Sequence, residues 1–139
     1  MIETLIVLGA APFIILGTVH GIYTAVDAKR PFRLTPRSQE VREAMQSTAL
    51  KIHPSTNTWQ GWIGFNFSHS LGAVTFGALY VFLAVAEFSV LEENTFLSVV
   101  AVLVSGSYLV LAYRYWFIIP LIGIGFGFAC FLGAAVLLA

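Results

Sequence analysis

Two histidines stand inside apolar stretches of this chain, and they are its residues best suited to chemistry. His20 lies in the first apolar stretch, and His69 lies in the second, three residues after Asn66. Polar and ionisable groups are costly in hydrocarbon and usually face the interior of a helix bundle. An imidazole can donate or accept a proton near neutral pH. The histidines therefore predict a polar site inside a membrane protein.

Helical spacing places further polar residues on the faces that carry the histidines, because residues three, four or seven positions apart share one side of a helix. His20 lies seven residues before Asp27, roughly 10 Å along the helix, and Asn66 lies at a similar distance from Trp59. The two levels therefore match. The predicted pocket lining is His20, Thr24, Trp62, Asn66, Ser68, His69 and Tyr108. The predicted pocket mouth is Asp27, Lys29 and Arg30.

Several chemistries remain open for this pocket. It can bind a lipid headgroup or a small polar ligand, or a histidine can act as a general base on a lipid. Haem held between His20 and His69 is chemically sound, although no cofactor is predicted. No metal site is predicted, since zinc usually takes three or four ligands. The structural alternative is interhelical hydrogen bonding, worth about 0.6 kcal/mol per bond on average.

The elements that position these residues follow from composition. The chain is 58% hydrophobic and only 10% charged, against about 25% charged for a soluble domain. Each crossing of a bilayer needs about 20 apolar residues. We expect an all-α membrane four-helix bundle forming one domain, residues 1–139, with no soluble catalytic module. The predicted spans are residues 4–26, 59–86, 95–113 and 117–138. The net charge of zero suggests no nucleic-acid partner.

The polar segment 27–58 is predicted to carry a short amphipathic helix. Thr35-Pro36 is a typical helix start, and His53-Pro54 is the predicted end. Apolar or small side chains recur between them at helical spacing, at Val41, Met45, Thr48 and Ile52. This helix is expected at the membrane surface or folded against the spans.

Charge gives an expected orientation. Segment 27–58 holds Lys29, Arg30, Arg33, Arg37, Arg42 and Lys51 against Asp27, Glu40 and Glu43. The next loop is acidic, with Glu87, Glu92 and Glu93. Positive loops stay in the cytoplasm, so segment 27–58 is predicted inside and both termini outside, in a bacterial inner membrane. The first span carries Glu3 and no early basic residue, and we read it as a retained span.

The fourth span is rich in small residues, which let membrane helices approach closely. Gly123, Gly125, Gly127 and Ala129 make overlapping small-xxx-small steps. This span is the expected docking face for a second copy or for a partner in a larger membrane complex, which makes an accessory subunit an alternative function.

The second span also carries a resemblance. The run Trp59-Gln-Gly-Trp-Ile-Gly-Phe-Asn-Phe-Ser-His-Ser-Leu-Gly72, with His20-Gly21, Thr24 and the stretch 32–36, resembles a group of small, uncharacterised bacterial four-span membrane proteins. The resemblance covers about the first half of the chain. It implies a fold and a location, and no activity. The positions that it points to are His20, Thr24, Trp59, Asn66, Ser68 and His69.

Overall fold

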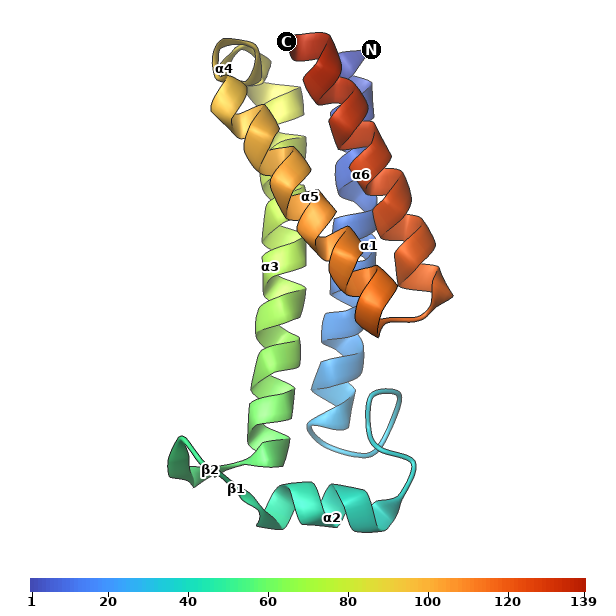
Figure 1. Ribbon diagram of the computed structural model, residues 1–139, viewed down its shortest axis with the longest axis vertical. Coiled ribbons are helices and arrows are strands. Elements are labelled where there is room, and N and C mark those ends of the chain that lie inside the picture. The colour runs from blue at the N-terminus through green and yellow to red at the C-terminus, as the bar shows by residue number, and fades with distance from the viewer. The chain divides into compact units, whose positions relative to one another are not determined.

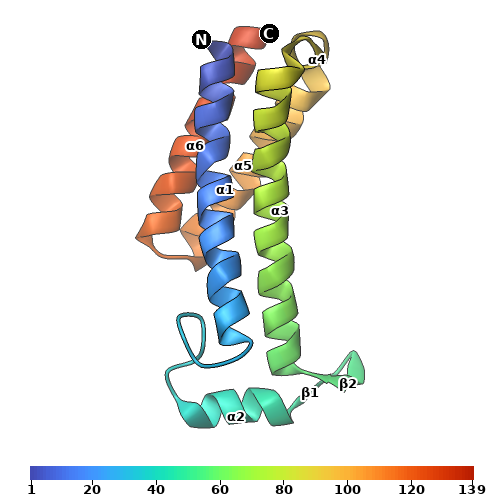
Figure 2. The same ribbon diagram turned by 180° about the vertical axis from the view of Figure 1, so that it is seen from behind.

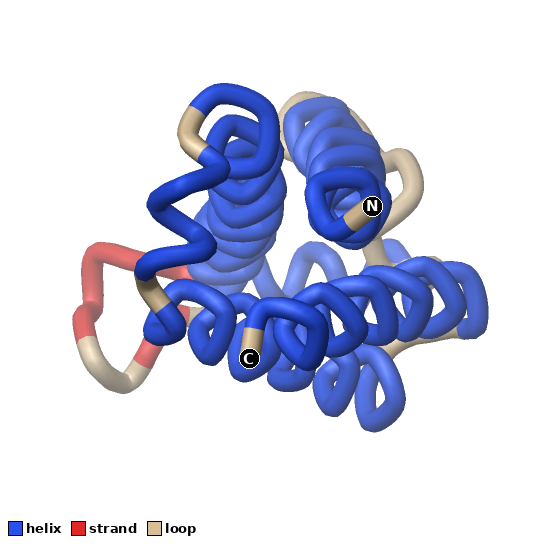
Figure 3. The backbone as a smooth tube through the Cα atoms, turned by 90° about the horizontal axis from the view of Figure 1, so that it is seen from above, coloured by secondary structure: helices blue, strands red, loops and turns tan.

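A computed structural model describes residues 1–139, and most of the chain is helical (Figures 1 and 3). The four long helices are α1 (Ile2–Asp27), α3 (Thr58–Ala86), α5 (Thr95–Tyr115) and α6 (Ile118–Leu138). Each is long and apolar enough to cross a membrane. The all-α class is confirmed, and each of the four long helices begins and ends within two residues of a predicted span.

The polar segment between α1 and α3 forms a helix and a small hairpin. The predicted amphipathic helix is present as α2 (Gln39–Ser47), and none of its residues is buried. It is followed by an antiparallel pair of strands, β1 (Ala49–Leu50) and β2 (His53–Asn57), which the sequence did not predict. The chain is already extended at Thr48, directly after the helix.

Both predicted ends of α2 are wrong, for local reasons. Ser38 caps the helix and accepts a hydrogen bond from the Val41 amide, whereas the Thr35 hydroxyl turns back to Asp27. The first amides of a helix have no partner within the helix, so they donate hydrogen bonds to a nearby side chain that can reach them. At the other end, His53 precedes a proline, which favours extended backbone, and so it lies in β2.

The chain divides into two compact units, and the division falls inside α1 and α3. Unit 1 contains residues 1–16 and 73–139, and unit 2 contains residues 17–72. Unit 1 is a bundle of the first part of α1, the second part of α3, α5 and α6, with the short helix α4 (Phe88–Glu93) between α3 and α5. Both chain termini lie at the same end of this bundle (Figures 1 and 2).

Aromatic rings fill the centre of unit 1. The Phe13 ring lies 4.9 Å from the Phe76 ring and 5.5 Å from the Tyr108 ring, both edge to face. Phe131 from α6 packs against Phe76 and Tyr80 at 5.4 and 5.2 Å. Such pairs stabilise a core beyond the burial of their surface, by about 0.5–1.5 kcal/mol each. The centre of this bundle is therefore apolar.

Unit 2 is held together by smaller contacts around the ends of α1 and α3. A Cβ atom at Gly21 would lie 3.4 Å from the Ser70 Cβ, so the two helices are close at this point. The Arg42 guanidinium lies over the buried Trp59 ring at 5.7 Å and links α2 to the start of α3. These contacts place the polar end of the helix pair beside the basic segment.

Candidate functional site

Three polar side chains from α1 and α3 meet within unit 2. The Nε2 atom of His20 lies 2.8 Å from Oδ1 of Asn66. The rings of His20 and His69 are 5.5 Å apart between centroids and meet edge to face, at 81°. Asn66 is buried, and both imidazoles are half-buried. We refer to His20, Asn66 and His69 as the His–Asn cluster.

Small residues beside the cluster let the two helices come together. Gly21 of α1 faces Ser70 of α3, and neither has bulk that would separate the backbones. The Ser70 hydroxyl donates to the Asn66 carbonyl at 2.9 Å, and the Thr24 hydroxyl donates to the His20 carbonyl at 2.9 Å. Each hydroxyl is therefore satisfied within its own helix. The hydrogen bond that joins the two helices is the one between His20 and Asn66.

The hydrogen bonds of Asn66 determine which nitrogen of His20 carries a proton. The Asn66 amide nitrogen donates to the Trp62 carbonyl at 2.7 Å, so its Oδ1 must be the atom that faces His20. An oxygen there can only accept, and Nε2 of His20 must therefore donate. The interhelical bond therefore uses Nε2 of His20, and Nδ1 takes no part in it.

Asp27, predicted at the pocket mouth, is fully buried and organises the loop after α1. Its carboxylate accepts hydrogen bonds from the Phe32 amide at 2.8 Å and the Leu34 amide at 2.9 Å, and from the Thr35 hydroxyl. The Arg33 amide adds a longer bond of 3.3 Å. These bonds occupy both oxygens, so Asp27 does not orient a histidine as a catalytic carboxylate would.

Lys29 and Arg30, also predicted at the mouth, lie elsewhere. They line an open groove together with three apolar residues of α1, namely Ile22, Ala25 and Val26. Ile22 follows His20 by two positions, which is about 200° around a helix. Thr24 and Asp27 follow His20 by four and seven positions, so they lie on the same face of α1 as His20. The groove and the His–Asn cluster are therefore on opposite faces of α1.

The other predicted lining residues are divided. The Trp62 carbonyl accepts a hydrogen bond from Asn66, but the Trp62 ring is exposed. Ser68 is also exposed, and its hydroxyl donates to the Phe65 carbonyl at 2.9 Å. Tyr108 belongs to unit 1, where its ring lies 6.3 Å from Trp116. The cluster thus contains the histidines and Asn66, and the place of Tyr108 in a pocket stays a prediction.

Two buried neighbours were not among the predicted lining residues, and the same spacing rule identifies them. Ser70 lies four residues after Asn66, and Trp59 lies seven before it, so all three share one face of α3. Both are buried. Both serines are adjacent to His69, but Ser68 lies two residues from Asn66 and is exposed, so the helical period selects Ser70.

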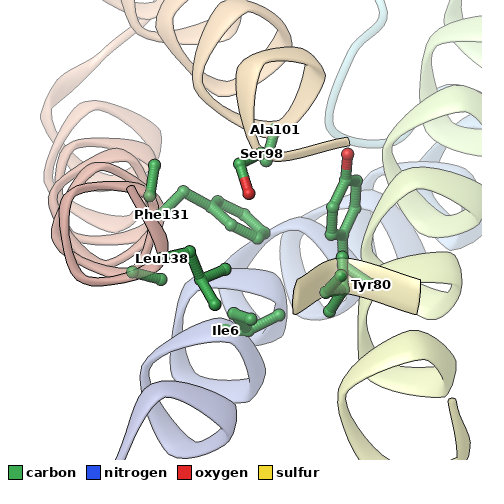
Figure 4. Close-up of a pocket in the computed structure, with 9 residues that line it drawn as sticks. Ile6, Tyr80, Ser98, Ala101, Phe131 and Leu138 are labelled. Carbon is green, nitrogen blue, oxygen red and sulfur yellow. The ribbon is translucent and has the colours of Figure 1, made fainter. Parts of the chain in front are cut away.

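A second cavity lies inside unit 1 and is too small for a ligand. It has a volume of about 10 Å³, which is no more than one water molecule occupies. Ile6, Tyr80 and Phe131 line it, and the Ser98 hydroxyl points into it (Figure 4). The Tyr80 hydroxyl instead donates to the Leu97 carbonyl at 2.6 Å.

The glycines of α6 are used inside unit 1. A Cβ atom at Gly127 would lie 2.8 Å from the Gly9 carbonyl oxygen, and one at Gly123 would lie 3.0 Å from the Leu16 side chain. Both glycines therefore face α1. Docking of a partner or second copy through this helix, which stays a prediction, would have to use its other residues.

Coupling between His20 and Asn66 can be measured by a double-mutant cycle. We expect His20→Phe and Asn66→Leu each to lower the free energy of unfolding, with a coupling energy of about 0.6 kcal/mol and at most about 1.7 kcal/mol. Thermal unfolding in mild detergent gives the four values. The same cycle with Ser68→Ala in place of Asn66→Leu should show no coupling. Equal coupling in both cycles would contradict the hydrogen bond.

No group of three or more His, Cys, Asp or Glu side chains is arranged to hold a metal ion. Ligation of haem iron through Nε2 of His20 would require the bond to Asn66 to break, so the haem alternative needs a different ring orientation. The chemistry of the site is thus that of two imidazoles and an amide between two helices. No protein-family model, curated protein or solved structure matches the chain.

Proposed function

We propose that this protein resides in a bacterial inner membrane with both termini outside and segment 27–58 in the cytoplasm. Four helices with the length and composition of membrane spans support an integral location. The orientation rests on the basic excess of segment 27–58 and on the acidic loop that precedes α5. The end of α1 and the start of α3, which carry the His–Asn cluster, are then at the cytoplasmic side.

Within that frame, the function that we propose is binding of a lipid headgroup or a small polar ligand at the His–Asn cluster. The observation that carries this proposal is the contact between two half-buried imidazoles on different apolar helices. His69 adds a second imidazole beside the bond between His20 and Asn66. Ionisable groups within apolar membrane helices usually mark functional sites.

Each residue has a distinct part in this proposal. Asn66 holds Nε2 of His20 and thereby sets the ring orientation. Nδ1 of His20 and the ring of His69 are the groups that contact the ligand, as donors or acceptors according to their protonation. Gly21 and Ser70 keep the helices close enough for both rings to reach the same ligand.

Native mass spectrometry tests this function. The protein is purified from its host membrane in mild detergent, and any mass that remains bound is recorded. We expect a bound species in the wild type and in Ser68→Ala, and its loss in His69→Phe. The His69→Phe protein should retain its helical circular dichroism, because Asn66 and His20 still join the helices.

If every species bound to the wild type persists in His69→Phe, or if the wild type carries none, the His–Asn cluster is only a structural contact. Thermal unfolding of both variants provides the necessary comparison. If His69→Phe loses the ligand only because it unfolds, His69→Gln, which retains a polar side chain, provides a second variant. It should retain the fold, and we expect it to bind less than one tenth as much.

A further inference from the structure

We propose that the groove on the outer face of α1 binds one anionic phospholipid. Its phosphate lies at Lys29 and Arg30, and one acyl chain runs along Ile22, Ala25 and Val26. This site does not rest on the function proposed for the His–Asn cluster. It uses other residues, on the opposite face of the helix.

The shape of the groove suits an amphipathic ligand. The groove is open, with a volume of about 440 Å³, within the range of about 300–1,000 Å³ typical of small-molecule sites. Its apolar part comes from the last turns of a membrane helix, and its two cations follow directly. Ile22 lies seven residues before Lys29, so the apolar part extends roughly 10 Å from the charged end.

Both cations are positioned and available. The amides of Lys29 and Arg30 donate to the Val26 carbonyl at 3.0 and 2.9 Å, which continues the helical turn past the end of α1. Their side chains are exposed. The nearest carboxylate in the sequence, that of Asp27, is occupied by the loop amides and the Thr35 hydroxyl. The Asp27 carboxylate therefore does not compete with an external anion for Lys29 and Arg30.

The charge of the loop favours an anion. The stretch 28–37 contains Lys29, Arg30, Arg33 and Arg37 and no acidic residue. A guanidinium binds phosphate oxygens through two parallel hydrogen bonds, and a lysine adds a point charge. Basic residues beside a membrane helix attract anionic lipids by about 1 kcal/mol each.

The apolar part of the groove decides between a lipid and a soluble phosphate compound. Val19 and Ile22 are exposed on the same side of α1, which in a bilayer is the side that faces acyl chains. A soluble phosphate would leave Ile22, Ala25 and Val26 uncovered. A phospholipid covers these residues and the cations together.

The test compares two pairs of neutralising substitutions that remove equal charge. Purified protein is titrated with phosphatidylglycerol or phosphatidylcholine in detergent, and binding is followed by native mass spectrometry. We expect wild type to bind phosphatidylglycerol in preference to phosphatidylcholine. Lys29→Gln with Arg30→Gln should weaken phosphatidylglycerol binding about 30-fold. Arg33→Gln with Arg37→Gln, in the same loop but outside the groove, should weaken it less than threefold.

Four results would overturn the proposal. Equal losses in the two pairs would mean that the loop attracts anions without a defined site. Equal binding of the two lipids by wild type would mean that the cations do not contact the phosphate. Displacement of the lipid by equimolar glycerol phosphate would assign the site to a soluble ligand. Ile22→Ser should also weaken phosphatidylglycerol binding without any change of charge, and unchanged binding would exclude the acyl contact.

Discussion

Replacement of Asp27 by alanine is expected to lower the free energy of unfolding by about 3 kcal/mol. The carboxylate is fully buried and is the common acceptor for the amides of Phe32 and Leu34 and for the Thr35 hydroxyl. Alanine would leave these donors without their acceptor. The loss of free energy per hydrogen bond is smaller than for a fully buried donor, because the surrounding loop is exposed and water can reach part of it.

The position of Asp27 makes this dependence stronger. Asp27 is the last residue of α1, where the helix dipole disfavours a negative charge. The converging amides of the loop compensate for this, since successive backbone N–H groups form an anion-binding concavity. Carboxylate and loop thus stabilise each other. Asp27→Asn should cost about 2 kcal/mol, because its amide nitrogen would face donors.

Thermal unfolding in detergent and cleavage by trypsin check this prediction. Asp27→Ala should unfold at a lower temperature and be cleaved faster after Arg33, in the loop that it releases. Glu40→Ala is the matched control, since Glu40 is an exposed carboxylate of the same segment. Its effect should stay within about 0.5 kcal/mol. If the two variants behave alike, Asp27 does not hold the loop.

The features that depend on helix length and helical rise were predictable from the sequence. Long apolar runs determine the four spans, because only helices of that length satisfy their backbone in hydrocarbon. Counting helical rise from Asp27 and from Trp59 places His20 and Asn66 at one level, and the structure joins them by a hydrogen bond. Length and rise are properties of the helix itself, so they need no knowledge of its neighbours.

The face of a helix on which each polar residue lies was predicted less well. Ser68 and Ser70 both flank His69, and Ser68 was placed in the predicted lining, whereas the buried hydroxyl is that of Ser70, which faces Gly21. Lys29 and Arg30 were expected beside the polar pocket, but the helical turn carries them to the groove on the opposite face. In both cases residues that are close in sequence lie on different faces of one helix, and the helical period separates them where adjacency does not.

Irregular structure was the least predictable. Nothing periodic relates Asp27 to residues 32–35, because the loop closes through backbone amides whose identity the side chains do not reveal. The same holds for the hairpin of Ala49–Leu50 with His53–Asn57, which contains a proline and no alternating apolar pattern. Thr35-Pro36 matched a helix start, yet the threonine hydroxyl had a stronger acceptor in a buried carboxylate.

Replacement of Gly127 by alanine is expected to lower the free energy of unfolding by about 2 kcal/mol. The added Cβ would lie 2.8 Å from the Gly9 carbonyl oxygen and 2.9 Å from the Phe13 ring. Both distances are shorter than van der Waals contact, and one of the two atoms belongs to the backbone. Helix α1 must therefore move away from α6, which loosens the aromatic packing around Phe13.

Gly133→Ala is the matched control for this change, because Gly133 lies on the same helix. Its added Cβ would meet only Leu5 Cδ1, at 3.9 Å, which is ordinary contact. Alanine favours a helix over glycine by up to about 1 kcal/mol, so Gly133→Ala should be neutral or stabilising. Thermal unfolding in detergent separates the two variants, and equal stability would contradict the close approach of α1 and α6.

The same pair of variants separates internal packing from docking. If Gly127 served a partner or a second copy, Gly127→Ala would leave the unfolding of the monomer unchanged and would alter only the size of the purified particle. The distance to the Gly9 oxygen favours the opposite result, a less stable monomer of unchanged size. Small residues in a membrane helix mark a close approach, and the contacts of each glycine show which helix makes that approach.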